Sequence, residues 1–202
     1  MNRLLKAATH GPLARRLTRT KAQSRRTTSR EDPTPKPLLA HAFSYPKGAG
    51  LIGPGAKPLL RAILVDAMTR RDRAIEVIVA ESDLDELLGG VPRELLTAPG
   101  SVLHVSQTLE DTIERLESST TGTAEQPLTL WVATPGADAD VIHQTLEARS
   151  ESSLIGLLNG PWPYGPTHYI DVDGPRQLPT QELKLLSCAQ AIAVLQAHRT
   201  TL

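Results

Sequence analysis

Short apolar runs alternate with amphipathic segments along most of the chain, and this alternation limits the possible folds more than any other feature. LTLWVA (128–133) and SLIGLL (153–158) are nearly continuous apolar runs, the pattern of strands that are buried on both faces of a parallel sheet. AIEVIVA (74–80) and SVLHV (101–105) are further runs rich in β-branched residues. The order of the runs predicts an α/β fold, a three-layer sandwich with a mainly parallel sheet.

The segments between these runs space their apolar residues by three and four, which predicts helices. The first helix is expected from about residue 58 to 71. In the second, DLDELL, Ser82 and Asp85 have the spacing of a capping box, and Gly89 with Gly90 marks the end. Three more helices are expected over residues 106–117, 138–149 (with Val141, Ile142 and Leu146 facing inward) and 180–198 (with Thr180 as the N-cap).

The rest of the sequence limits the class of protein. THYIDVDG (167–174) predicts an edge strand that an Asp-Gly turn closes. Cys188 is the one cysteine, which excludes an internal disulfide and a cysteine-based zinc site, and its apolar neighbours predict a small buried residue. No run of 18 apolar residues occurs, because Arg61 and Asp66 interrupt the longest candidate. The start of the chain also lacks the apolar core of a secretory signal, so we expect a cytoplasmic protein.

The charges are unevenly distributed although the net charge is zero. Residues 1–36 contain ten Lys or Arg and two acidic residues, whereas the chain from Lys47 onward contains twelve basic and twenty acidic residues. This composition predicts a disordered basic arm with a Pro-rich linker over residues 1–40, followed by one α/β domain over residues 41–202.

Four roles are open for the basic arm. It could lie on an anionic membrane surface, act as an organelle transit peptide, or be a solvated tail without a role. It could also contact nucleic-acid phosphates, and the residues that would do so are Arg15, Arg16, Arg19, Lys21, Arg25 and Arg26.

The stretch GLIGPGAKPLL, from Gly50, resembles the phosphate-binding loop G-x-x-x-x-G-K-[ST] without matching it. With Gly50 and Gly55 at the two glycine positions, Ala56 stands in place of the lysine and Lys57 in place of the hydroxyl residue. Moving the register by one residue restores the lysine but loses both glycines and the hydroxyl. Pro58 also predicts an extended rather than a helical Lys57.

A nucleotide site also needs an acidic residue at the tip of a buried strand, and LTLWVA is followed by Thr134, Pro135 and Gly136 instead. The lysine, the hydroxyl and the acid of triphosphate chemistry are then all missing, so we expect no enzyme activity, no cofactor and no metal. Weak binding of an anion at the start of the first long helix stays open, and its residues would be Gly53, Gly55, Ala56 and Lys57.

The loop GPWPYGP follows a buried strand, at the end of the sheet where ligands of parallel sheets bind. Trp162 and Tyr164 therefore either contact a partner or pack over the sheet edge. The six histidines show no metal-binding spacing. His168 is near Asp171 and Asp173 in sequence, but alternation along a strand places it on the opposite face of the sheet from both.

Four stretches, taken in order, carry a resemblance to a known family: GLIGPGAKPLLRAILVDAM, AIEVIVAESDLDELLG, PLTLWVATP and SSLIGLLNGPWPYGPTHYIDVDG. Over about residues 45–198 they resemble a domain of large actinobacterial proteins. Those proteins also contain membrane helices, a LysM module and a C-terminal bacterial transcriptional activator (SARP-type) domain, none of which this chain shows.

That domain is similar in layout to RecA-like motors of the FtsK/SpoIIIE type. By this comparison Gly50, Gly53 and Gly55 match the loop glycines, while Ala56 and the Thr134–Pro135 pair mark where the catalytic lysine and acid are missing. The resemblance implies a degenerate P-loop domain that acts as a non-catalytic regulatory or scaffold module through protein contacts. The alternative is a nucleic-acid-associated accessory protein that uses the basic arm.

Overall fold

The structure, a computed structural model, describes residues 37–44, 47–70, 75–96, 102–118, 127–149, 153–175 and 184–200. All of these residues belong to one compact unit. Residues 1–36 of the predicted arm and linker lie outside them, including all six residues proposed to contact nucleic acid.

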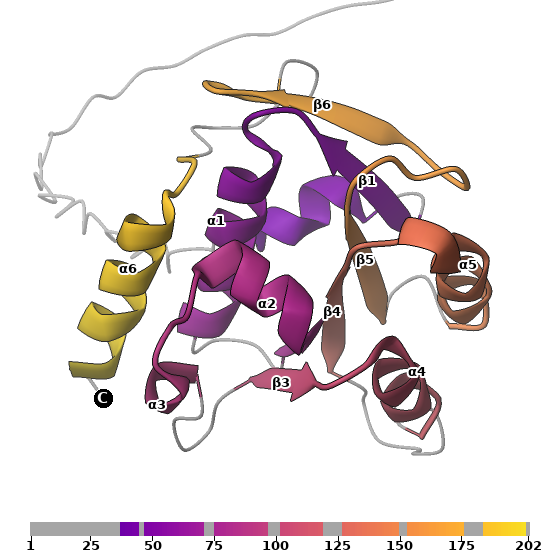
Figure 1. Ribbon diagram of the computed structural model, residues 1–202, viewed down its shortest axis with the longest axis horizontal. Helices are drawn as coiled ribbons and strands as arrows, with labels where there is room; N and C mark the ends of the chain where they lie inside the picture. The colour runs from indigo at the N-terminus through magenta and orange to yellow at the C-terminus, as the bar shows by residue number, and fades with distance from the viewer. Residues whose placement is uncertain are drawn as a thin grey trace, which may run out of the picture. The chain divides into compact units, whose positions relative to one another are not determined.

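Seven strands within the described ranges form one sheet, in the order β3-β2-β4-β5-β1-β6-β7 (Figure 1). Each neighbouring pair of these strands is parallel except the antiparallel pair of β6 and β7. The predicted α/β fold with a mainly parallel sheet is confirmed. The strands are β1 (Gly48–Ile52), β2 (Ile75–Ala80), β3 (Leu103–Ser106), β4 (Leu128–Ala133), β5 (Leu154–Asn159), β6 (Thr167–Asp171) and β7 (Gly174–Pro175).

Helices cover both faces of this sheet, as Figure 1 shows. Val77, Leu130 and Leu157 point into a core with α1, α2, α6 and the 3-10 helix η1. Ile78 and Trp131 point to the opposite face, which α4 and α5 cover. The helices are η1 (Leu39–Phe43), α1 (Ala56–Thr69), α2 (Glu81–Leu88), α3 (Arg93–Leu96), α4 (Leu109–Ser118), η3 (Gly136–Asp138), α5 (Ala139–Glu147) and α6 (Cys188–Thr200).

The sequence does not predict β1, which lies between β5 and β6. Gly50, expected in a loop, is a residue of this strand and pairs with Leu158 and Thr167. A Cβ atom on Gly50 would lie 2.6 Å from the carbonyl oxygen of Gly160, and one on Gly48 would lie 2.9 Å from Leu146. The backbone contact therefore requires glycine at position 50, although glycine is rare in strands, whereas the flexible Leu146 side chain could move away from a Cβ atom at position 48.

Several element ends differ from the expected ones. The folded domain begins before residue 41, because Leu38 and Ala40 are buried in the core. Ser82 lies inside α2, which begins without a side-chain cap, so the predicted capping box is wrong. The predicted end of α2 is confirmed, because Gly89 has a φ of 59° and donates its N–H to the carbonyl of Asp85.

The starts of α4 and α6 carry capping pairs that we did not predict. Thr108 and Asp111 each accept the other's backbone N–H, and Ser187 and Gln190 do the same. The helix α6 therefore begins later than expected, and Thr180 lies outside the described residues.

Two side chains are more exposed than the sequence predicts. Val141 is 44% exposed on α5, although Ile142 and Leu146 face the core as expected. Cys188 is only half-buried, because it begins α6 at the edge of the core and its Sγ donates to the carbonyl of Leu88 at 3.0 Å.

Candidate functional site

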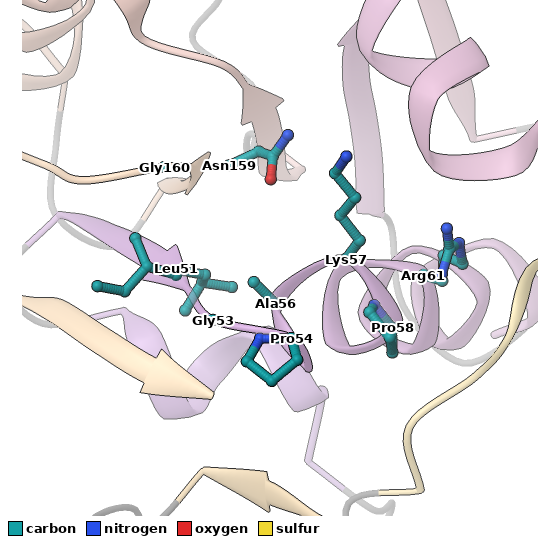
Figure 2. Close-up of a pocket in the computed structure, with 10 residues that line it drawn as sticks. Leu51, Gly53, Pro54, Ala56, Lys57, Pro58, Arg61, Asn159 and Gly160 are labelled. Carbon is teal, nitrogen blue, oxygen red and sulfur yellow. The ribbon is translucent and has the colours of Figure 1, made fainter. Parts of the chain in front are cut away.

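A cavity of about 550 Å³ opens at the carboxyl ends of β1 and β5, where α1 begins (Figure 2). After β1 the chain runs through α1 to β2, which lies beyond β5 and β4 on one side of β1. After β5 the chain runs in the opposite direction across the sheet, to β6 on the other side of β1. Ligands of parallel sheets bind at such a change of direction. Lys57, Pro58, Arg61 and Asn159 are among the residues that line the cavity.

The loop between β1 and α1 uses its backbone donors internally. Gly53 turns the chain with a φ of 97°, and Gly55 is the N-cap of α1. The N–H of Gly55 donates to the carbonyl of Ile170 on β6 at 3.0 Å, and the N–H of Ala56 donates to the carbonyl of Gly53 at 3.2 Å. A phosphate-binding loop turns such N–H groups toward its ligand, so two of the expected anion contacts are already occupied.

The glycines of this loop are explained by the close approach of β6. A Cβ atom on Gly53 would lie 2.5 Å from the carbonyl oxygen of Ile170. One on Gly55 would overlap the carbonyl oxygen of Asp171 and lie 2.8 Å from the Ile170 side chain. Close packing against β6 is therefore one reason for glycine at both positions.

Lys57 lies within the first turn of α1, so the predicted extended conformation is wrong. Pro58 is tolerated beside it because N–H groups in the first turn have no partner within the helix. The Lys57 ammonium forms an ion pair with the carboxylate of Glu86 on α2, and both side chains are nearly half exposed. In Figure 2 the Lys57 side chain extends from the start of α1 on the side of Asn159.

A chain of hydrogen bonds continues from Glu86 across the ends of two strands. Asn159, the last residue of β5, donates its Nδ2 to Glu86 at 3.2 Å and to the hydroxyl of Thr134 at 3.3 Å. Thr134 follows β4, and its hydroxyl and N–H donate to the two oxygens of Asp83 at 2.6 and 3.2 Å. We call Lys57, Glu86, Asn159, Thr134 and Asp83 the strand-end network.

The sequence has no acidic residue directly after β4, but the strand-end network brings the carboxylate of Asp83 to Thr134 at that point. Asp83 and Glu86 come from α2, which directly follows the parallel strand β2. Burial raises the pKa of the Asp83 carboxyl, although the two hydrogen bonds from Thr134 lower it in part. The sequence contains one sign of these residues, the acidic run SDLDE directly after a predicted parallel strand. The carboxyl ends of all parallel strands meet at one edge of the sheet, so these acids could be expected near the ends of the other strands.

A second cavity, of about 360 Å³, adjoins the network, and Asp83, Glu86, Thr108 and Asp138 are among its lining residues. In the part of the chain that the structure describes, no three His, Cys, Asp or Glu residues are grouped so that they could hold a metal ion. The acids of the strand-end network instead bond to Lys57, Asn159 and Thr134.

The two aromatic candidates in the loop after β5 differ sharply. Trp162 is 4% exposed and packs against Gly48 and Gly50 of β1, so in this structure it is part of the core. Tyr164 is 43% exposed, and its ring stacks on His143 with centroids 4.2 Å apart. Its hydroxyl donates to Asp140, and this hydrogen bond raises the pKa of Tyr164.

No family model, curated protein or solved structure matches the chain. The resemblance to the actinobacterial domain and its RecA-like layout therefore stays a prediction. None of the helices in the described ranges has the length and apolar character needed to cross a bilayer.

Proposed function

We propose that this α/β domain is a non-catalytic module, with a regulatory or scaffold role, that acts through protein contacts. The observation that carries the proposal is the hydrogen bond from the Gly55 N–H to the carbonyl of Ile170. A phosphate group that bound to the Gly55 N–H would have to displace β6 from this loop. The resemblance to domains of actinobacterial regulators supports a regulatory role.

The charges near the loop support the same proposal. Lys57 is the lysine nearest to the position that the catalytic lysine takes in a phosphate-binding loop, and it forms an ion pair with Glu86. An exposed ion pair of this kind contributes only about 0–1 kcal/mol to stability, so its main effect is to neutralise the ammonium. A triphosphate would also meet the carboxylates of Glu86 and Asp83, and two like charges 4 Å apart repel by about 4 kcal/mol at an effective dielectric constant of 20.

Calorimetry with Mg-ATP and Mg-GTP, together with a phosphate-release assay, tests this proposal. The full chain is compared with Lys57→Ala and with Lys184→Ala, which removes an exposed lysine ahead of α6. We expect no saturable binding and no turnover in all three proteins. Magnesium-dependent turnover that Lys57→Ala abolishes and Lys184→Ala retains would overturn the proposal.

A further inference from the structure

The cavity of about 360 Å³ beside the strand-end network lies at a second change of direction in the sheet. From β2 the chain runs through α2 and α3 to β3, whereas from the neighbouring strand β4 it runs through α5 to β5 on the other side. The helices α2 and α5 also cover opposite faces of the sheet (Figure 1). Two parallel strands whose connections diverge in this way leave a crevice at their carboxyl ends, where ligands bind. We call this space the β2–β4 cavity, because Ala80 of β2 and Ala133 of β4 both line it.

The lining of the β2–β4 cavity is acidic. Asp83, Glu86 and Asp138 contribute to it, and its described lining contains no Lys, Arg or His. Glu86 forms its ion pair with Lys57, and Asp83 accepts two hydrogen bonds from Thr134. The carboxylate of Asp138 makes no cap hydrogen bond to α5 and has no other partner among the described residues. The cavity therefore attracts positive charge, and one of its carboxylates is not engaged within the protein.

The helices α2, α4 and α5 begin at this cavity, and the start of a helix by itself favours an anion. The start of α4 is closed, because the N–H groups of Thr108 and Asp111 bond to each other's side chains. The N–H of Thr134 likewise bonds to Asp83. At the starts of α2 and α5 stand the carboxylates of Asp83 and Asp138. An anion would therefore meet carboxylates at this cavity, whereas a cation would meet acceptors.

A buried hydroxyl beside the cavity points to an occupant. Ser106 is 3% exposed, and its Oγ has no hydrogen-bond partner in the part of the chain that the structure describes. Ser106 pairs with Ala80 in the sheet, so the two side chains lie on the same face. Ala80 and Gln107, the residue after Ser106, both line the cavity. Buried polar groups are normally hydrogen-bonded, and the cavity is the adjoining space from which a partner for this hydroxyl can come.

The size and walls of the cavity fit a small organic molecule. Its volume lies at the lower end of the range of small-molecule pockets, and Leu109 and Trp131 supply apolar walls. The described residues contain no group of three ligands for a metal ion, so an organic cation fits the cavity better than a metal ion does.

We propose that the β2–β4 cavity binds a small alkylammonium ion. Its ammonium group bonds to the carboxylates of Asp83 and Asp138. Its alkyl chain packs against Leu109 and Trp131. This ligand goes beyond the proposed function, because it gives a module that acts through protein contacts a small-molecule signal to which it can respond.

Calorimetry on the full chain with putrescine tests the proposal. Butanediol has the same carbon chain without charge, and succinate has a carbon chain of the same length with the opposite charge. We expect saturable binding of putrescine and of neither control compound. If putrescine does not bind in a saturable manner, or if butanediol or succinate binds as tightly, the proposal is wrong.

Two matched variants locate the bound cation. Asp138 and Asp173 are both exposed, but Asp138 lines the cavity and Asp173 lies in the turn between β6 and β7, at the far edge of the sheet. We expect Asp138→Asn to weaken putrescine binding about fivefold, the upper end of the effect of an exposed ion pair. Asp173→Asn should leave the affinity unchanged, and circular dichroism should show that both proteins are folded. Equal affinities of the two variants for putrescine would contradict the proposed site.

An NMR titration of the ¹⁵N-labelled full chain with putrescine separates the β2–β4 cavity from the cavity at the start of α1. We expect the amide signals of Asp83, Ser106 and Thr134 to shift along one saturation curve, and those of Gly53 and Gly55 to remain in place. Saturable shifts at the two glycines alone, or shifts spread evenly over the acidic surface, would overturn the proposal. Because no nucleotide is present, this result does not depend on the test of the proposed function.

Discussion

The replacement of Gly55 by alanine tests whether the loop glycines serve packing. Gly55 has a φ of −89°, which any residue can adopt, so the backbone itself does not require glycine. The added Cβ would overlap the backbone carbonyl of Asp171, and β6 cannot yield as a flexible side chain could. The site is the N-cap of α1, where alanine is also a poor residue.

The expected loss of stability follows from these terms. Overpacking against backbone costs about 1–3 kcal/mol, and alanine in place of glycine at an N-cap costs about 0.7 kcal/mol. The smaller conformational freedom of the unfolded chain returns about 0.4–1 kcal/mol. We therefore expect Gly55→Ala to lower the free energy of unfolding by about 1–3 kcal/mol, measured by urea denaturation with circular dichroism and the fluorescence of the buried Trp131 and Trp162.

Gly55→Ser separates the clash from the capping effect. Serine adds the same Cβ, but its hydroxyl is a preferred helix cap, so without a clash it would stabilise α1 by a few tenths of a kcal/mol. We expect both variants to lose stability. If Gly55→Ser is more stable than the wild type, or if Gly55→Ala lies within about 0.5 kcal/mol of it, β6 does not impose glycine at this position.

Three further predictions follow from the core and from the shifted pKa values. Leu130→Asp should unfold the domain, because Leu130 is fully buried in β4 and an unpaired charge there costs several kcal/mol. The control Leu130→Met should lower the free energy of unfolding by less than about 1.5 kcal/mol. A Leu130→Asp variant that circular dichroism shows to be folded would contradict the placement of Leu130 in the core. Asp140→Asn should lower the raised pKa of Tyr164 toward that of a free tyrosine in a spectrophotometric titration, because it removes the charged acceptor, and an unchanged titration would refute this cause. Because the pKa of Asp83 is raised on folding, this carboxyl contributes stability below its ordinary value of 3.8 that is lost as the pH rises through the raised value. The wild type should therefore lose stability relative to Asp83→Asn over that pH range in parallel urea titrations, and a constant difference between the two proteins would count against the raised pKa.

The sequence predicts those strands in which burial alone determines the pattern of apolar residues. LTLWVA is β4 with the expected bounds, because a strand covered by helices on both faces needs apolar residues at every position. The strand β1 escapes prediction because its glycines are selected by contacts with Leu146, Gly160 and Trp162, which are distant in sequence. A glycine-rich strand and a phosphate-binding loop look alike until these contacts are known.

The strand-end network is similarly hidden from sequence reasoning. Thr134 and Asp83 are 51 residues apart, and Asn159 and Glu86 are 73 residues apart. Each residue alone suits a helix or a strand end, and only the order of the strands brings them to one edge of the sheet. The exposure of Val141 has the same origin, because α4 and α5 leave a groove whose width the helical repeat does not specify.

An NMR titration of the ¹⁵N-labelled full chain with Mg-ATP tests the central claim most directly, because it observes the backbone N–H groups in question. The hydrogen bonds of Gly55 and Ala56 within the protein predict that the amide signals of Gly53, Gly55, Ala56 and Lys57 do not shift in a saturable manner. Saturable shifts at these four amides, lost in Lys57→Ala, would show that the start of α1 holds a nucleotide and would contradict the account.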